Sequence, residues 1–167
     1  MVNQKRAVEV GVEKLLRKAA EKLGVEGNCF YNVFHHTEDV RKSGDSYVNA
    51  MQLHYNVYVP TEVAEKFKGL INPILNLGKM EVSEMEPGEE YDPVNGIGKT
   101  IVGFFLLWHH PDGPDSESAM RDAECEKAFC SRMGVKYDGA LEKKLMGFDS
   151  GVYPDIDSAV YLSNVKF

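Results

Sequence analysis

The chain has 167 residues, of which 43% are hydrophobic and 27% are charged, and its formal net charge is −7. This length fits one domain, and this composition is typical of a folded globular chain, which argues against intrinsic disorder. The acidic balance argues against a broad phosphate-binding surface, because such surfaces depend on clustered Lys and Arg, so we expect no sequence-specific nucleic-acid partner.

The first predicted element is an amphipathic helix over residues 5–23. Its apolar residues recur every three or four positions, which puts them on one helical stripe, and Gly24 supplies a stop. Residues 1–6 lead into this helix and not into an apolar leader, so we expect synthesis in the cytoplasm. The stripe consists of Val8, Val12, Leu15, Leu16, Ala19 and Leu23.

A β-hairpin is predicted next. Residues 29–35 are rich in aromatic and β-branched side chains, as strands are, and residues 38–45 are too polar to bury. Residues 47–59 then alternate apolar and polar side chains until Pro60. We therefore expect one face of this long strand in the core and the other against solvent or a neighbouring subunit.

A helix and a short strand are predicted after the hairpin. Thr61 offers a hydroxyl cap for an amphipathic helix over residues 61–75, and Pro73 is expected to kink or end this helix. Residues 79–85 alternate in hydrophobicity and predict a further strand.

The most apolar strand is predicted over residues 100–109, after a turn-rich acidic link over 86–98. It is apolar on both faces, which is typical of a central strand that is covered on both sides. Its apolar run, Ile101 to Trp108, is much shorter than the roughly 20 residues that cross a bilayer, so we expect no membrane span.

The remaining part predicts a helix and a last strand. Asp115 or Ser116 caps a helix that ends at Gly134, and its apolar stripe is Cys125, Ala128, Phe129 and Met133. A short helical piece is predicted over 140–146 and a strand over 158–167.

These elements predict an α+β fold with a mixed or antiparallel sheet of about four to five strands and helices packed on one face. We assign residues 1–110 to the α+β core domain. Residues 111–167 form a C-terminal helix and strand extension of the same domain.

Strand-end histidines are the candidate metal ligands. His35 and His36 close one apolar strand and His109 and His110 close another; with Asp112 they offer groups that zinc or another transition ion prefers. Adjacent strand residues point to opposite faces, so each pair supplies one ligand at most, and the candidate site is His35, His109 and Asp112. The alternative, which we favour, is histidines at a solvent boundary with no metal and no other cofactor.

No catalytic motif is complete. The segment Gly96–Thr100 resembles part of a phosphate-binding loop, but Pro93 stands where the first glycine is needed and a strand follows. The three cysteines, Cys29, Cys125 and Cys130, lack a CxxC spacing and suit reduced, mostly structural thiols. We therefore predict no catalytic residues.

Charged residues in the hairpin connection and in the acidic link are the candidate subunit contacts. Such residues favour steering and register between partners more than affinity. The candidates are Arg41, Lys42, Asp45, Glu84, Glu89 and Glu90.

Three stretches carry a family resemblance: the strand Met51–Pro60, the helix 61–75, and Met80–Trp108 with Tyr91, Asp92 and Gly98 in its turn. In this order they resemble the tail-terminator (minor tail protein) family of long-tailed bacteriophages, over roughly residues 8–110. The resemblance implies a subunit of a ring, usually hexameric, that caps the tail tube and joins it to the head. It also implies a virion protein made in the host cytoplasm, with tail-tube and head-completion proteins as partners and no catalytic residues.

Two hypotheses follow. The first is a ring-forming tail terminator or head–tail connector subunit. The second is a small α+β ligand- or metal-binding domain, or an enzyme, that uses His35, His36, His54, His109 and Asp112.

Overall fold

The structure is a computed structural model of the 167-residue chain. It describes residues 7–42, 45–75, 81–85, 99–109, 116–137 and 160–166. The predicted helical piece over 140–146 and the acidic link over 86–98 lie outside these residues.

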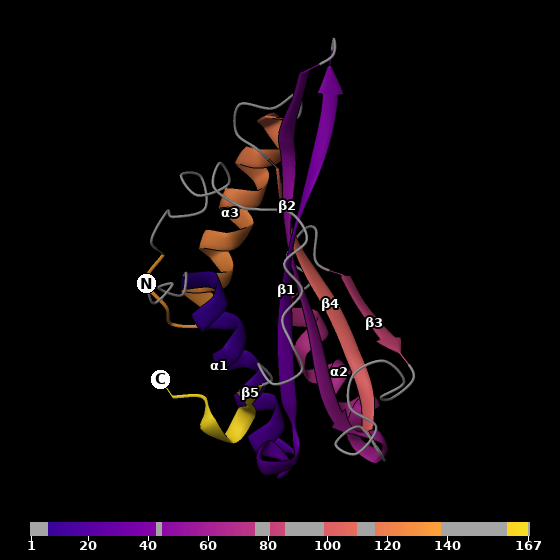
Figure 1. The fold of residues 1–167 in the computed structure, drawn as a ribbon. Coiled ribbons are helices and arrows are strands. Elements are labelled where there is room, and N and C mark those ends of the chain that lie inside the picture. Colours follow the sequence, from indigo (N-terminus) through magenta and orange to yellow (C-terminus); the bar gives the residue numbers. More distant parts are fainter. Residues whose placement is uncertain are drawn as a thin grey trace.

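The described strands form one antiparallel sheet in the order β3-β4-β2-β1-β5 (Figure 1). Long β1 and β2 form a hairpin, β4 pairs with the other side of β2, and two short strands pair at the ends of the order. The strands are β1 (Phe30–Lys42), β2 (Asp45–Pro60), β3 (Glu81–Met85), β4 (Lys99–His109) and β5 (Val160–Tyr161). The predicted α+β class and antiparallel sheet are confirmed.

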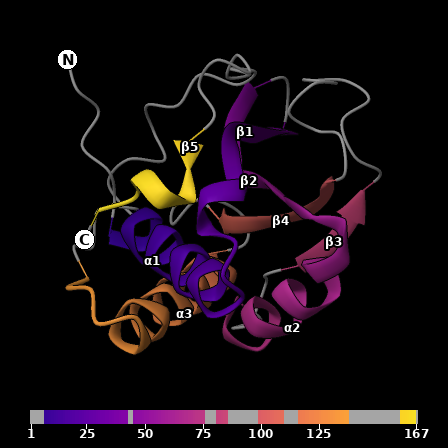
Figure 2. The same cartoon turned by 90° about the horizontal axis from the view of Figure 1, so that it is seen from below.

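The three described α-helices lie on one side of this sheet, as Figure 2 shows. Gly24 and Gly134 follow the first and the last of them with φ values of 68° and 69°, so both act as the predicted helix stops. The helices are α1 (Ala7–Lys22), α2 (Ala64–Leu75) and α3 (Ser116–Arg132), and the 3-10 turns are η1 (Glu26–Asn28), η2 (Thr61–Val63) and η5 (Leu162–Asn164).

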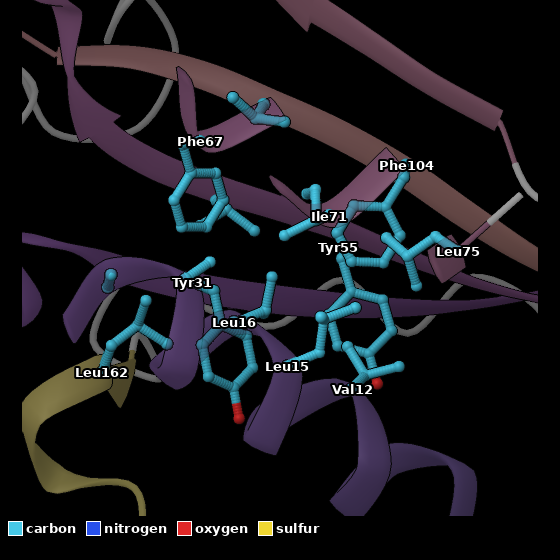
Figure 3. Packing of buried hydrophobic residues seen from close by; sticks show 14 of the residues in the cluster. Val12, Leu15, Leu16, Tyr31, Tyr55, Phe67, Ile71, Leu75, Phe104 and Leu162 are labelled. Carbon is cyan, nitrogen blue, oxygen red and sulfur yellow. The ribbon is translucent and has the colours of Figure 1, made fainter. Parts of the chain in front are cut away.

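The main core lies between the helices and one face of the sheet (Figure 3). Tyr31 and Val57 are directly opposed on β1 and β2, and Tyr55 stacks on Phe104 of β4 with ring centroids 5.0 Å apart. These residues are buried in the same cluster as residues of all three helices. The helix contributions include Val12, Leu15 and Leu16 from α1, Phe67, Ile71 and Leu75 from α2, and Phe129 from α3.

A smaller cluster lies on the opposite face of the sheet. It consists of Phe30, Tyr58 and Ile101, which share one row of the strand pairing, and the rings of Phe30 and Tyr58 stack with centroids 4.5 Å apart. Ile101 and its neighbour Val102 are both buried although they alternate in direction. The prediction that this strand is central and covered on both sides is therefore confirmed for β4 at these positions.

Two local expectations were wrong. The first strand does not end at residue 35, because β1 continues to Lys42, and β2 starts at Asp45 and not at residue 47. Thr61 does not cap the following helix through its side chain; its hydroxyl accepts a hydrogen bond from the Thr100 hydroxyl at 3.1 Å. Pro73 stands in the last turn of α2, which continues to Leu75, and the carbonyl that loses its partner belongs to exposed Gly69.

The C-terminal elements also differ from expectation. In α3 the buried face contains Asp122, Glu126, Phe129 and Cys130, and Met133 is buried just after the helix, whereas Cys125 is half-buried and Ala128 is exposed. The expected last strand is only two residues long within the described part, and η5 follows it.

The end of the described chain is tied to α1. Leu162 and Val165 are buried in the main core, and the Arg17 guanidinium donates hydrogen bonds to the carbonyls of Ser163 (3.0 Å) and Val165. The last segment therefore belongs to the same packed unit as α1 and the sheet.

Candidate functional site

The far end of the β1–β2 hairpin extends beyond the rest of the sheet. The pairing of β2 with β4 ends at Ala50 and His109, and the following pairs, from Asp39 with Val48 to Lys42 with Asp45, involve only β1 and β2 among the described strands. We call residues 39–42 and 45–48 the arm. In Figure 1 the arm projects past the end of α3.

A β-bulge marks the base of the arm. Glu38 is opposite Ala50 and Asp39 is opposite Val48, so β2 carries the extra residue, Asn49. Bulges bend a strand pair and increase its twist, and here the bulge comes at the point where β4 ceases to pair. The bulge therefore separates the arm from the rest of the sheet. Because the extra residue is on β2, β1 keeps a regular two-residue alternation.

Among the described strands, little of the outer side of β1 is paired. β5 pairs only with Phe30 and Tyr31, so within the described residues no strand covers the outer side of residues 32–42, which we call the open edge. This stretch is roughly 36 Å long at about 3.3 Å per residue. Unpaired edges of such length are templates for pairing with another chain.

One hydrogen bond shows which backbone N–H and C=O groups of β1 point away from β2. The Cys29 carbonyl accepts a hydrogen bond from the Leu162 N–H at 2.9 Å, so Cys29 faces outward, away from β2. Strand alternation then directs the N–H and C=O groups of every second residue outward. Along the open edge these residues are Val33, His35, Thr37, Asp39 and Arg41.

The predicted subunit-contact residues fall at two separate places. Arg41 is opposite Ser46, and Lys42 is opposite Asp45, so three candidates lie together at the tip of the arm. Glu84 lies on β3, the strand at the other end of the sheet, and is opposite Val102 of β4. Glu89 and Glu90 lie outside the described residues.

The register does not bring the predicted metal ligands together. His35 shares a row with Leu53 and Leu106, whereas His109 shares a row with Ala50 and Glu38. The two histidines are therefore two strands and three residues apart, roughly 14 Å at Cα from spacings of about 4.8 Å and 3.3 Å. An odd offset also places them on opposite faces of the sheet.

The remaining parts of the metal hypothesis add no described ligand set. Asp112 lies outside the described residues, and among those described no group of three or more His, Cys, Asp or Glu side chains is placed to hold a metal ion. His36 is opposite Gln52 and His54 is opposite Phe34, so these two histidines occupy different rows of the hairpin.

The thiols do not form a nucleophilic site in the described part of the chain. Burial raises the pKa of the Cys29 thiol to about 12, so it stays protonated at neutral pH. Cys130 is also buried, Cys125 is half-buried, and all three thiols are free.

A pair of buried asparagines is a feature that the sequence patterns did not reveal. Asn32 and Asn56 are directly opposed on β1 and β2, two residues along the strands from Phe30 and Tyr58, and are only 2% and 3% exposed. The Asn32 carboxamide and the Asn56 Oδ1 have no hydrogen-bond partner among the described residues. The alternation of these asparagines with aromatic residues could have indicated their burial. A strand face that contains asparagine is, however, normally expected to face solvent.

Comparison of the chain with family models, with curated proteins and with solved structures gave no match. Within the described part of the chain, no helix combines the length and apolarity that crossing a membrane requires. The proposed function therefore rests on the arm and the open edge.

Proposed function

We propose that the chain is a structural subunit that assembles with copies of itself. The setting is the one that the sequence resemblance implies, a ring-forming tail terminator or head–tail connector subunit of a phage virion that caps the tail tube. Its partners are then further copies of the chain, the tube and the head-completion proteins. This role requires neither a catalytic residue nor a cofactor.

The observation that supports this proposal is the open edge of β1. Natural sheet proteins normally shorten, cover or bend their edge strands, because unpaired N–H and C=O groups invite pairing with other chains. Within the described part of the chain, β5 pairs with two residues of β1, and no described strand lies beside residues 32–42. A strand of a neighbouring subunit would satisfy these backbone groups.

The charges of the arm support the same proposal. Arg41 and Lys42 give its β1 side a basic end in a chain of net charge −7, and β3 at the other end of the sheet carries Glu81 and Glu84. Charges of opposite sign at two separate places on one chain steer copies of the chain toward each other.

Size-exclusion chromatography with light scattering, followed by electron microscopy, tests self-assembly. We expect a defined oligomer that appears as a ring. A chain that stays monomeric at high concentration contradicts the proposal. Co-expression with the products of the neighbouring genes tests the phage setting. A ring that binds no tail tube in this experiment contradicts the assignment as a tail terminator.

A charge-reversal pair makes this test specific to the arm. Arg41→Glu with Lys42→Glu is expected to weaken assembly, because it removes the basic end of the arm. The matched control is Lys18→Glu with Lys22→Glu, which makes the same charge change at two exposed positions of α1 and is expected to leave assembly unchanged. Equal effects of the two variants would show that net charge, and not the arm, governs assembly.

A further inference from the structure

We infer that two copies of the chain pair through their open edges, β1 against β1 in antiparallel direction, about a two-fold axis at Thr37. This inference deepens the self-association in the proposed function and does not depend on the phage setting. It rests on the direction of the β1 backbone groups that no described strand pairs with, and on the order of residue types along β1.

The outward-facing residues of the open edge are arranged symmetrically. They are Val33, His35, Thr37, Asp39 and Arg41, and Thr37 is the middle one. In an antiparallel pair centred there, Thr37 is opposite Thr37 of the second copy. Every outward-facing residue then meets another outward-facing residue, and five such pairs form about ten backbone hydrogen bonds.

The residue types on the two sides of Thr37 are complementary. Residues 34–40 read Phe-His-His-Thr-Glu-Asp-Val. The proposed register sets His35 opposite Asp39 and His36 opposite Glu38, so each histidine is paired with a carboxylate. Phe34 and Val40 are also opposite each other, which pairs an aromatic with a β-branched residue, and such cross-strand pairs stabilise antiparallel sheets.

Neighbouring registers lack this complementarity. A pair centred on His35 or His36 sets a histidine against its own copy. A pair centred on Glu38 or Asp39 sets two carboxylates directly opposite each other, which is unfavourable. Only the register centred on Thr37 opposes both acidic residues of this stretch to histidines.

The bulge does not interrupt the proposed pairing strand. The extra residue at the bulge is Asn49 on β2, so β1 alternates regularly from Val33 to Arg41. Pairing through β1 joins two five-stranded sheets into one continuous sheet. A contact of this kind is two-fold symmetric, so a ring built from such pairs has an even number of subunits.

Disulfide mapping tests the register. In this register the Cα atoms of His36 and of Glu38 from the second copy are about 4.5 Å apart, which is within disulfide range. We expect a mixture of His36→Cys and Glu38→Cys chains to form a covalent dimer on mild oxidation. Each variant alone is the matched control, because the two copies of the same position are then roughly 8 Å apart at Cα, too far for a disulfide.

A wild-type sample under the same oxidation controls for the native thiols, two of which are buried and one half-buried. Dimers in the mixture and not in the separate variants support the register. Equal cross-linking in all three samples, or none in the mixture, overturns it.

A backbone variant tests the contribution of the edge without cysteines. Thr37→Pro removes an outward-facing N–H, so the ladder between β1 and β2 loses no hydrogen bond. We expect Thr37→Pro to weaken association by about tenfold or more, and Thr37→Ala, which keeps the N–H, to retain it. Circular dichroism confirms that both variants fold, and if Thr37→Pro does not fold, the disulfide mapping decides alone. Association of folded Thr37→Pro equal to that of Thr37→Ala overturns the inference.

The outcomes separate this inference from the proposed function. Rings without the cross-link overturn the β1 pairing and leave self-assembly standing. Cross-linked pairs that never grow beyond dimers support the β1 pairing and contradict the ring. A monomer at all concentrations contradicts both.

Discussion

The two ends of the β1–β2 hairpin are built from the same two strands but have different surroundings. At one end Tyr31 and Val57 are opposed and buried beneath the helices. At the other end Arg41 and Ser46 are opposed, and there the strands pair only with each other among the described residues. One hydrogen-bonded ladder therefore runs from a packed core into a two-stranded arm.

The two ends of the hairpin therefore have different roles: the packed end stabilises the domain, and the arm is available for interaction with other subunits. Burial of apolar surface is the main favourable term in folding, so the packed end holds the domain together. A two-stranded ribbon alone is marginally stable, so the arm depends on the packed end for its shape. Substitutions at the arm are then expected to change assembly and to leave the stability of the domain unchanged, whereas substitutions at the packed end are expected to lower its stability.

The strongest test of this comparison is the same change made at both ends of β2. Val57 is fully buried, and Val57→Ala is expected to lower the free energy of unfolding by about 2 to 3 kcal/mol through lost burial and a residual cavity. Val48→Ala, in the arm, is expected to cost less than about 0.5 kcal/mol. Urea denaturation at a low protein concentration measures both. Similar losses for the two variants would show that the arm is packed as tightly as the core.

A second test concerns a polar contact inside the packed end. The Tyr31 hydroxyl on β1 donates a hydrogen bond to the Glu13 carboxylate on α1, and both residues are buried. Tyr31→Phe removes the donor and is expected to lower the free energy of unfolding by about 1.5 kcal/mol at pH 7. Tyr161→Phe, at an exposed tyrosine, is the matched control and is expected to change it by less than about 0.5 kcal/mol.

The same variant predicts a pH dependence. Burial, reinforced by the hydrogen bond and negative charge of Glu13, raises the pKa of Tyr31 above its usual value of 10.0. Above pH 10 the tyrosine ionises in the unfolded chain but not in the folded one, so the wild-type protein loses stability there as pH rises. The difference in unfolding free energy between wild type and Tyr31→Phe should therefore shrink from pH 9 to pH 11. A constant difference over this range would contradict the assigned cause.

Local patterns were enough to predict most elements of the fold. The two-residue alternation before Pro60 predicted β2, and the helical stripe before Gly24 predicted α1. The same reasoning misplaced the buried face of α3, because Asp122 and Glu126 are buried carboxylates that a pattern of apolar residues leaves out. It also ended the first strand at residue 35, although β1 continues to Lys42, because the polar stretch 38–45 shows no apolar alternation.

The candidate site depends on pairings between distant segments, and these were harder to predict. The positions of Arg41, Lys42 and Asp45 at one tip follow from the local hairpin. The separation of His35 from His109 depends on the strand order and on the register of β2 with both neighbours. No local spacing contains that information, so the metal hypothesis could not be weighed until the register was known.

The smallest expected effects come from two glycines in the helical layer, and they show how closely the packed end is filled. A Cβ built on Gly11 of α1 would lie 2.9 Å from the Phe129 ring of α3, a ring that is itself fully buried. Gly11→Ala gains helix propensity of up to about 1 kcal/mol, but the overpacking costs about 1 to 3 kcal/mol, so a net loss of about 1 kcal/mol is expected. Gly69 of α2 is exposed and has nothing within 4 Å of its Cβ position, so Gly69→Ala should stabilise by about 0.5 to 1 kcal/mol. Thermal and urea unfolding of the two variants measure these opposite signs, and a stabilised Gly11→Ala would mean that α1 and α3 can move apart at no cost.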